Sequence, residues 1–313
     1  MTSPKIAFII NPGAGGKKKN KLREALIKKI AGMFPESPLE FSASADDASR
    51  LTRRMLEGDF ECIAVVGGDG SIRSVVEGFF KDDKGTPVKK DASLAVIPLG
   101  TGGDFRKTLG LDRDPFSALS ILKGPASKPC DVGMVQYTDF EGKTRKNYFI
   151  NIASFGLGGL VDKYVQESSK KLGGTLTFFF STIKAFRHYK NATVEMTLDD
   201  REKITKKSLL VTVANGRFFG SGMEIAPMAD TNDGTFEIII MGNMRFKDFA
   251  VHSRHLYAGK TLSHPEIIYK SARKLKIEAL NENEPMYLDM DGEPLGVIPA
   301  TVEIFPSAIN IKT

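Results

Sequence analysis

Three glycine-rich segments carry residue types that can bind phosphate. The first, Val65–Ser71, reads V-V-G-G-D-G-S and passes from an apolar run through glycines into a helix-like stretch. Glycine lets a backbone approach phosphate oxygens, and a helix N-terminus supplies free N–H groups and positive potential. Because Asp69 would repel phosphate, we expect it to act through Mg²⁺ or as a hydrogen-bond organiser. The alternative is a plain tight turn that requires glycine.

A second loop of this kind, Pro98–Phe105, reads P-L-G-T-G-G-D-F and follows the next apolar run. A third, Pro12–Gly16, is neither a Walker A motif nor a dinucleotide fingerprint, since Asn11 replaces the first glycine and Lys18 stands where Ser or Thr belongs. Two consecutive loops with glycines, a hydroxyl group and an aspartate favour phosphate binding more strongly than one loop does.

Two turns near the C-terminus carry carboxylates. In Leu288–Pro294 (L-D-M-D-G-E-P), Asp291 and Glu293 flank a glycine. A carboxylate on such a turn can deprotonate a substrate hydroxyl, but spacing alone favours a plain Asp-Gly hairpin. In Ala229–Thr235 (A-D-T-N-D-G-T), two aspartates three residues apart could hold a hard cation together with a backbone carbonyl. A solvated Asx turn explains this segment equally well.

The elements that must position these loops change character along the chain. Apolar runs at 5–11, 38–43, 61–66 and 93–98 alternate with helical spacings, which predicts a parallel sheet covered on both faces. Ligands of such sheets bind beyond the carboxyl ends of the strands, where the three glycine loops fall. After about residue 124 short strands dominate, with helices only near 157–188 and 246–258, which predicts a mostly antiparallel β-sandwich.

The composition is that of a globular protein with room for two domains. The chain has 313 residues, 41% hydrophobic and 26% charged, and its net charge of +6 favours an anionic partner. The absence of Trp and of an aromatic–basic RNP-like motif argues against nucleic acid. Two cysteines exclude a disulfide scaffold. Since neither a secretory signal nor an apolar run of about 18 residues is visible, we expect a soluble cytoplasmic protein.

One segment has the composition of a membrane-contacting surface. Residues 163–190 combine Lys163, Lys184 and Arg187 with several Phe and Leu residues. An apolar and basic helix pair can rest on an anionic membrane. A core-covering helix with a solvated face is the equal alternative.

In order and spacing, these motifs resemble the diacylglycerol kinase catalytic family, which includes bacterial soluble diacylglycerol kinases, related bacterial lipid kinases and sphingosine kinases. The resemblance covers essentially the whole chain. NAD kinases look similar at G-G-D-G, so the later motifs make the joint match specific. The matching segments are I-I-N-P-G-A-G-G (9–16), G-G-D-G-S (67–71), P-L-G-T-G-G-D-F (98–105), D-x-x-D-G (230–234) and D-G-E (291–293).

The resemblance implies an α/β + β fold with two domains. An N-terminal three-layer α/β domain with a parallel sheet would span 1–125, joined by a C-terminal strand at about 306–313. A C-terminal β-sandwich domain for the lipid substrate would span 126–305.

The resemblance also implies ATP and Mg²⁺ as cofactors and a role for each motif. Asp291 would be the general base for the lipid hydroxyl, with Glu293 nearby and Asp69 as the alternative base. A carboxylate–water network of Asp69, Asp104 and Asp131 would place the catalytic Mg²⁺, and a structural Mg²⁺ would bind Asp230, Asp233 and the carbonyl of Thr235. ATP contacts are implied for Asn11, Ser44 or Ser42, Gly67, Gly68, Asp69, Gly70, Ser71, Gly100, Thr101, Gly102 and Asp104.

Two residues depart from the family pattern. Ser71 replaces the usual Thr and keeps a hydroxyl group, whereas Gly103 replaces the usual Asn and removes an amide side chain. We expect the second change to affect one polar contact and not the fold.

The sequence therefore predicts an ATP-dependent lipid kinase that phosphorylates diacylglycerol or a related lipid. Its expected partners are a lipid substrate at a membrane surface and anionic phospholipid, with peripheral membrane association and no nucleic acid. A homodimer is left open. The alternatives are NAD kinase-like phosphorylation of a soluble dinucleotide and a non-catalytic nucleotide-binding protein.

Overall fold

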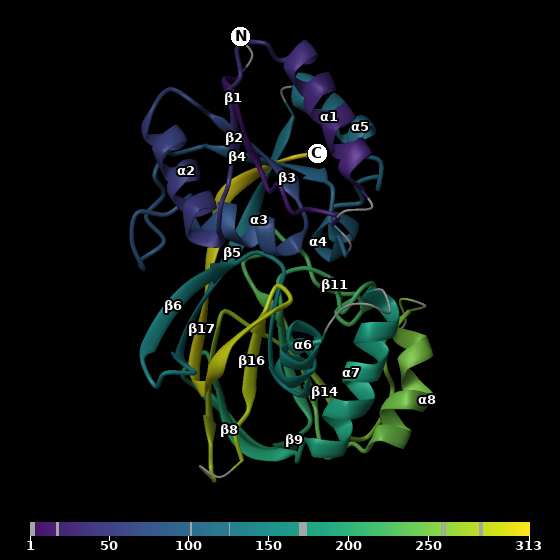
Figure 1. Ribbon diagram of the computed structural model, residues 1–313. Helices are drawn as coiled ribbons and strands as arrows, with labels where there is room; N and C mark the ends of the chain where they lie inside the picture. The colour runs from purple at the N-terminus through teal and green to yellow at the C-terminus, as the bar shows by residue number, and fades with distance from the viewer. Residues whose placement is uncertain are drawn as a thin grey trace. The chain divides into compact units, whose positions relative to one another are not determined.

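The computed structural model describes residues 4–16, 19–100, 102–124, 126–168, 174–257, 259, 261–281 and 284–313. The chain forms two compact units (Figure 1). Unit 1 comprises Met1–Val132 and Phe305–Thr313, and unit 2 comprises Gly133–Ile304. No helix within the described ranges is long and apolar enough to cross a lipid bilayer.

The centre of unit 1 is a parallel sheet. Its strands are β1 (Ile6–Ile10), β2 (Leu39–Phe41), β3 (Cys62–Gly67) and β4 (Ser93–Pro98), in the order β2–β1–β3–β4. The end of β17 (Glu293–Lys312) lies parallel to β4, with Asn310 opposite Ser93. Strands β1 and β3 are buried along their whole length, as expected for a sheet that is covered on both faces.

Helices cover this sheet because alternate strand residues point to opposite faces. Phe8 and Ile10 of β1 pack in one cluster with Leu26 and Ile30 of α1 and with residues of α5 and η2. Helices α2 and α3 pack against each other and against strands β1 and β3. The helices are α1 (Asn20–Met33), α2 (Ala45–Glu57), α3 (Asp69–Glu77), α4 (Asp104–Thr108), α5 (Pro115–Ala118) and the 3₁₀ helix η2 (Leu119–Lys123).

Unit 2 is built on antiparallel strand pairs. One run has the order β14–β13–β10–β7–β16–β17; β17 also pairs with β5 and β15, which continue as β5–β6 and β15–β8–β9. A separate short hairpin joins β11 (Phe218–Phe219) and β12 (Met223–Glu224). The other strands are β5 (Ser127–Asp139), β6 (Thr144–Phe149), β7 (Ile152–Gly156), β8 (Ala192–Leu198), β9 (Glu202–Ser208), β10 (Leu210–Ala214), β13 (Phe236–Met241), β14 (Ile267–Ala272), β15 (Lys274–Ala279) and β16 (Tyr287–Met290).

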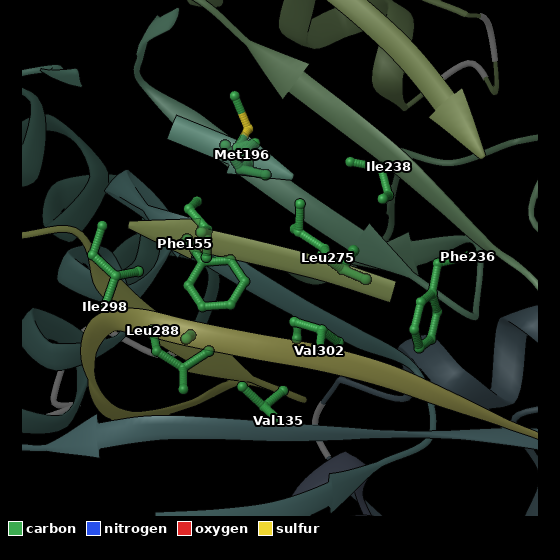
Figure 2. Close-up of a cluster of buried hydrophobic side chains, with 14 of the residues drawn as sticks. Val135, Phe155, Met196, Phe236, Ile238, Leu275, Leu288, Ile298 and Val302 are labelled. Atoms are coloured by element: carbon green, nitrogen blue, oxygen red, sulfur yellow. The ribbon is translucent and has the colours of Figure 1, made fainter. Parts of the chain in front are cut away.

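The strands of unit 2 enclose a buried apolar core (Figure 2). Phe155 of β7 and Leu288 of β16 lie in the same cluster as Met196 of β8 and Leu275 of β15. Burying each such side chain contributes about 1.5–3 kcal/mol relative to leaving it exposed. Together with the parallel sheet of unit 1, this sandwich confirms the predicted fold class.

A second apolar cluster lies on an outer face of the sandwich. It contains Ile152, Leu210 and Ile239 from the strands, together with residues of α6 (Leu157–Glu167), α7 (Gly174–His188) and α8 (Phe246–Leu256). The three helices therefore cover the strand face that the inner core does not use. This arrangement matters for the site, because α6 packs directly on strand β16.

One difference from the strands that the sequence predicts is at 147–153. The apolar run predicts one strand, whereas the structure has β6 ending at Phe149 and β7 beginning at Ile152. Ile150 and Asn151 lie between them, and their backbone N–H groups bind the carboxylate of Asp291. The strand is interrupted because a side chain takes the N–H groups that a neighbouring strand would otherwise use.

Candidate functional site

The three glycine loops of unit 1 lie at the carboxyl ends of β1, β3 and β4. Asn11, directly after β1, donates from Nδ2 to the Oγ of Ser71 at 2.9 Å and accepts the N–H of Gly13 through Oδ1 at 2.8 Å. Its own N–H donates to the carbonyl of Val66 in β3. Asn11 thus connects loop 12–16 to loop 65–71, and the hydroxyl group of Ser71 takes part in that connection.

Loops 65–71 and 98–105 approach each other closely through their backbones. A Cβ atom added to Gly100 would lie 2.5 Å from the Cα of Gly68, and one added to Gly68 would lie 3.2 Å from the Cα of Gly100. A Cβ atom on Gly67 would lie 2.5 Å from the side chain of Ser71. Only glycine fits at Gly67 and Gly100, so these glycines are required by close packing as well as by any ligand.

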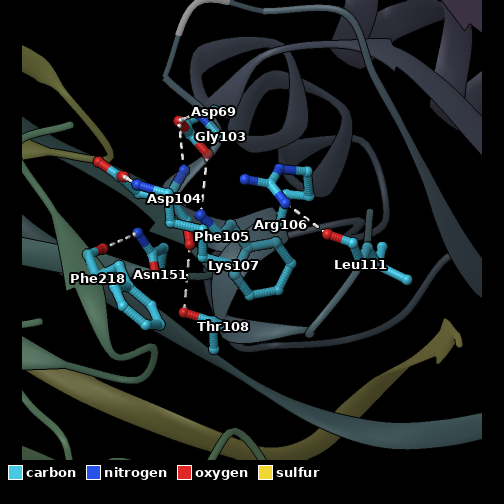
Figure 3. A network of polar contacts seen from close by, with 10 residues as sticks. All are labelled: Asp69, Gly103, Asp104, Phe105, Arg106, Lys107, Thr108, Leu111, Asn151 and Phe218. Atoms are coloured by element: carbon cyan, nitrogen blue, oxygen red, sulfur yellow. Dashed lines mark hydrogen bonds and ion pairs between the residues drawn. The ribbon is translucent and has the colours of Figure 1, made fainter. Parts of the chain in front are cut away.

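Asp69 connects the two loops through three hydrogen bonds (Figure 3). Its carboxylate accepts the N–H groups of Gly103 at 2.8 Å, Asp104 at 3.1 Å and Phe105 at 3.1 Å. These N–H groups belong to the N-terminal turn of α4, where the helix itself offers no carbonyl acceptor for them. Of the two roles expected for Asp69 from the sequence, the structure shows the hydrogen-bond organiser. Its action through Mg²⁺ and its role as the alternative base stay predictions.

The conformation of Gly103 explains the departure from the family pattern. Gly103 has φ +86° and ψ +45°, which is the left-handed region. Glycine adopts this region freely, and asparagine does so more readily than other residues with a Cβ atom. Position 103 therefore requires a residue that adopts the left-handed backbone conformation. Gly does so because it lacks a Cβ atom, and Asn does so more readily than other residues that have one.

A pocket lies beside these loops, and its lining adds cations that the motifs did not identify. Lys19, Arg106 and Arg113 line it together with the glycines of loops 67–68 and 100–103. The Nζ of Lys19 donates to the carbonyl of Gly100 at 2.9 Å, and burial, followed by the charge of Arg113, lowers the pKa of this ammonium group. Three cations beside glycine N–H groups make this pocket suitable for an anion.

The remaining predicted residues of unit 1 have different local contacts, and only Gly102 of those described lines this pocket. Ser42 is buried and donates to the carbonyl of Ile10 at 3.4 Å, while Ser44 caps α2 by accepting the N–H of Asp47. Gly70 lies in the first turn of α3, and Gly102 lies in the pocket lining. Thr101 lies outside the described residues.

Two buried aspartates of unit 1 already have partners. Asp104 begins α4, and its Oδ1 lies 3.4 Å from the Nζ of Lys107. Asp131 is completely buried in β5 and accepts the N–H of Ser307 at 2.6 Å. Asp131 therefore ties the C-terminal segment to unit 1; the Mg²⁺ roles of both residues stay predictions.

In unit 2, Asp291 lies on a tight hairpin between β16 and β17. Asp291 and Gly292 both have positive φ, +50° and +85°, as a type I′ turn requires. The Asp-Gly hairpin is therefore present, and Glu293 follows it as the first residue of β17, paired with Met290.

The carboxylate of Asp291 is held by three backbone N–H groups. These are the N–H groups of Ile150 at 3.2 Å, Asn151 at 3.2 Å and Ile152 at 2.9 Å. Three donors on one carboxylate favour its ionised form and fix its direction. The turn therefore presents a fixed, nearly buried carboxylate.

Two asparagines that the motifs did not identify hold the segment that binds Asp291. Asn151 donates from Nδ2 to the carbonyl of Phe218 at 2.9 Å (Figure 3), and Asn215 donates to the carbonyl of Ile150 at 2.6 Å. The Oδ1 of Asn151 is buried and has no hydrogen-bond partner among the described residues. The only sequence signal for Asn151 is a polar residue inside an apolar run.

The acidic loop 230–235 forms Asx turns, which the sequence predicts as the alternative to a cation site. Asp230 accepts the N–H of Asn232 at 3.1 Å, and Asp233 accepts the N–H and the hydroxyl of Thr235 at 2.9 and 3.1 Å. Two carboxylates and a carbonyl are donors of the type that Mg²⁺ prefers. No cluster of three or more His, Cys, Asp or Glu side chains suited to a metal ion occurs in the described part of the chain, so the Mg²⁺ site stays a prediction.

Two family models match nearly the whole chain. The diacylglycerol kinase catalytic domain matches residues 5–135, and the YegS C-terminal NAD kinase β-sandwich-like domain matches residues 151–313. The chain is 28% identical to a diacylglycerol kinase of Bacillus subtilis over 93% of this chain and 90% of that protein. It is also 28% identical to a probable lipid kinase YegS-like of Alcanivorax borkumensis over 85% of this chain and 83% of that protein.

Solved structures share the fold. A diacylglycerol kinase from Bacillus anthracis superimposes with a TM-score of 0.69 at 21% identity, covering 100% of this chain and 97% of that one. Yeast NADH kinase in complex with NADH superimposes with a TM-score of 0.54 at 12% identity, covering 99% and 84%. The motif order, the two-unit fold and the family matches agree, and this chain belongs to the diacylglycerol kinase catalytic family.

Proposed function

We propose that this protein is an ATP-dependent lipid kinase that transfers the γ-phosphate of ATP to a lipid hydroxyl group, with diacylglycerol or a related lipid as acceptor. The names of the relatives support a lipid substrate. The observation that carries the proposal is the pocket in unit 1, where Lys19, Arg106 and Arg113 lie beside two glycine loops.

The pocket has the chemistry that a polyphosphate needs. Phosphate oxygens accept hydrogen bonds from backbone N–H groups and pair with guanidinium groups. Lys19 is held at loop 98–105 by its hydrogen bond to the carbonyl of Gly100, so its ammonium group is positioned before any ligand binds. Phosphoryl transfer depends mainly on such positioning and on neutralisation of charge.

Asp69 and Asp104 each directly follow a glycine that lines this pocket. Asp69 holds the turn 103–105 by three N–H groups, and this fixes the carboxylate of Asp104 at the start of α4. Asp104, with a carboxylate beside the pocket loop, is the residue that would hold a metal ion there. Mg²⁺, when bound, neutralises charge on the transferring phosphoryl group.

Asp291 is the residue of unit 2 that would act on the acceptor. Its carboxylate is directed by three N–H groups and lies on a rigid two-residue turn. In this role Asp291 orients the lipid hydroxyl group and accepts its proton. Glu293, two residues further on, adds negative charge at the start of β17.

The test of this role is the Asp291→Asn variant. We expect its kcat to fall at least about a hundredfold, because positioned general bases contribute about 10²–10⁴-fold. Asp200→Asn is the matched control, since Asp200 is another hairpin aspartate of unit 2 with positive φ (+56°). Lipid phosphorylation by Asp291→Asn at a rate near wild type would rule out this role.

We also propose that α7 rests on an anionic membrane surface. Lys184, Arg187 and Lys190 are exposed at the end of the helix, and 54% of Phe180 is exposed. Basic and apolar side chains on one helix suit a surface of anionic lipids. Lys170, Lys171 and Leu172 of the predicted segment lie outside the described residues.

Flotation with anionic vesicles tests this membrane contact. Arg187→Glu should reduce binding at low salt, while Lys207→Glu on strand β9, an exposed control in the same unit, should not. Failure of the wild-type protein to bind these vesicles at low salt would remove the membrane role.

A further inference from the structure

Helix α6 lies unusually close to strands β7 and β16. A Cβ atom on Gly158 would lie 2.7 Å from the Oγ of Ser154, and one on Gly159 would lie 2.8 Å from the carbonyl oxygen of Tyr287. Two adjacent glycines therefore let the helix backbone approach the strands. Asp162 is three and four residues further along, so it lies on the same side of the helix.

A polar row crosses the strand face under this helix. Thr212 of β10 lies opposite Ser154 of β7, and Ser154 lies opposite Asp289 of β16. All three residues are buried, with Asp289 only 5% exposed. The surrounding cluster is apolar, so each polar atom in this row needs a partner.

Asp289 lacks such a partner on one oxygen. Its Oδ2 accepts a hydrogen bond from the Oγ of Ser154 at 3.4 Å. Its Oδ1 has no hydrogen-bond donor in the described part of the chain. A buried carboxylate oxygen without a donor carries the full cost of desolvation, and a proton removes that cost.

Asp162 is the charged group that acts most strongly on Asp289. Burial raises the pKa of Asp289 well above its ordinary value, and the charge of Asp162, a hydrogen bond with Asp162 and the charge of Asp291 raise it further, whereas Ser154 lowers it. Two ionised carboxylates have no proton to donate, so neither can form a hydrogen bond to the other. Such a pair becomes stable when it holds one proton.

The other charged groups nearby do not replace that proton. Lys163, the next residue on α6, lies over the rings of Phe140 and Tyr287, at 5.7 and 5.6 Å from their centroids. On the strands, Asp291 and Glu293 are acidic as well. The groups that act on Asp289 are therefore the hydroxyl group of Ser154 and the carboxylates of Asp162 and Asp291.

We propose that Asp162 and Asp289 share one proton, and that this O–H···O bond docks α6 on β16 and so positions Asp291 at the end of that strand. Asp289 and Asp162 are positioning residues in this account, and their effect on Asp291 rests on the proposed kinase function. The proton sharing itself does not depend on that function.

The shared proton has a defined effect on stability. The folded protein keeps a proton that the unfolded chain releases above about pH 3.9, the ordinary pKa of Asp. Folding stability therefore falls as pH rises from about 3.9 to the raised pKa that Asp289 has in the folded protein. Over this range the unfolding constant increases by up to about tenfold per pH unit. Asp289→Asn replaces the proton by an amide N–H and removes this dependence.

Infrared spectroscopy and urea unfolding test the proton directly. Above about pH 3.9, the ordinary pKa of Asp, the wild-type protein should still show the C=O stretch of a protonated carboxyl group, and both Asp162→Asn and Asp289→Asn should lack it. As pH rises above that value, the wild-type unfolding constant should rise relative to that of Asp289→Asn. A band that persists in Asp162→Asn, or parallel pH curves, would overturn the proposal.

Asp200→Asn is the control for the pH experiment. Hydrogen bonds from Lys276 and Lys274 lower the pKa of Asp200, so its contribution is present above about pH 3.9 and is lost only as pH falls further. The ratio of its unfolding constant to that of the wild type should therefore stay flat from about pH 5 to 8.

Kinase assays test the positioning of Asp291. Asp289→Ala should lower kcat at least about tenfold more than Asp289→Asn, with little difference in the KM for ATP, because small misplacements of a catalytic group are costly. Equal kcat values for the two variants would refute the positioning role. If the wild-type protein phosphorylates no lipid, the kinase proposal fails, and the infrared result still decides the shared proton.

Discussion

Replacing Asp69 should loosen glycine loop 98–105 and weaken nucleotide binding. Asp69→Ala removes the acceptor for the N–H groups of Gly103, Asp104 and Phe105, at 2.8, 3.1 and 3.1 Å. A hydrogen bond to a charged group contributes about 1.5–3 kcal/mol, but these donors are partly accessible to water. We therefore expect a loss of about 3 kcal/mol in total.

This loss should appear in two measurements. For a unit of this size, about 3 kcal/mol corresponds to a fall of about 10 °C in Tm. If binding must first restore the loop, the same energy weakens ATP affinity about a hundredfold. Asp69→Asn keeps one oxygen for Gly103 and Asp104 and turns an amide toward the N–H of Phe105, so both effects should be intermediate.

Calorimetry with a non-hydrolysable ATP analogue and thermal unfolding test this expectation. Asp82→Ala is the matched control, because Asp82 also accepts two backbone N–H groups, those of Lys84 and Thr86, in the turn after α3. This control should lower Tm and leave ATP affinity unchanged. If Asp69→Ala binds the analogue as tightly as the wild type, the loop does not depend on Asp69 and the reasoning is refuted.

Two further substitutions test the pocket. Gly103→Asn should leave stability nearly unchanged, whereas Gly103→Val should cost about 1–2 kcal/mol or more in thermal unfolding, because φ is +86°. Equal stability of the two variants would contradict the conformational explanation. Arg113→Gln should weaken ATP binding about tenfold and make it less sensitive to salt, as measured by calorimetry at two ionic strengths. Unchanged affinity would remove Arg113 from the site.

The placement of the glycine loops was predictable from the sequence. Strands that are apolar throughout must be covered on both faces, and the carboxyl ends of parallel strands meet at one edge. The loops after β1, β3 and β4 therefore had to lie together. The hairpin at Asp291 was also predictable, because Asp-Gly between two strands favours positive φ at both positions.

The partners of the acidic residues were not predictable, because they depend on contacts between distant parts of the chain. Asp69 binds N–H groups 34–36 residues away, and Asp291 binds N–H groups about 140 residues away. The cations Lys19, Arg106 and Arg113 lie on three separate segments without a motif, and only the fold brings them to one pocket. The pair of Asp162 and Asp289 likewise joins a helix to a strand 127 residues further on.

Transfer of the labelled γ-phosphate of ATP to lipids in mixed micelles tests the central claim most directly. The acceptors should include diacylglycerol, a sphingoid base, ceramide and phosphatidylglycerol, with NAD as a soluble acceptor in parallel. We expect label in a lipid, with diacylglycerol the best acceptor, and none in NAD. Label in NAD alone, or in no acceptor, would contradict the assignment as a lipid kinase.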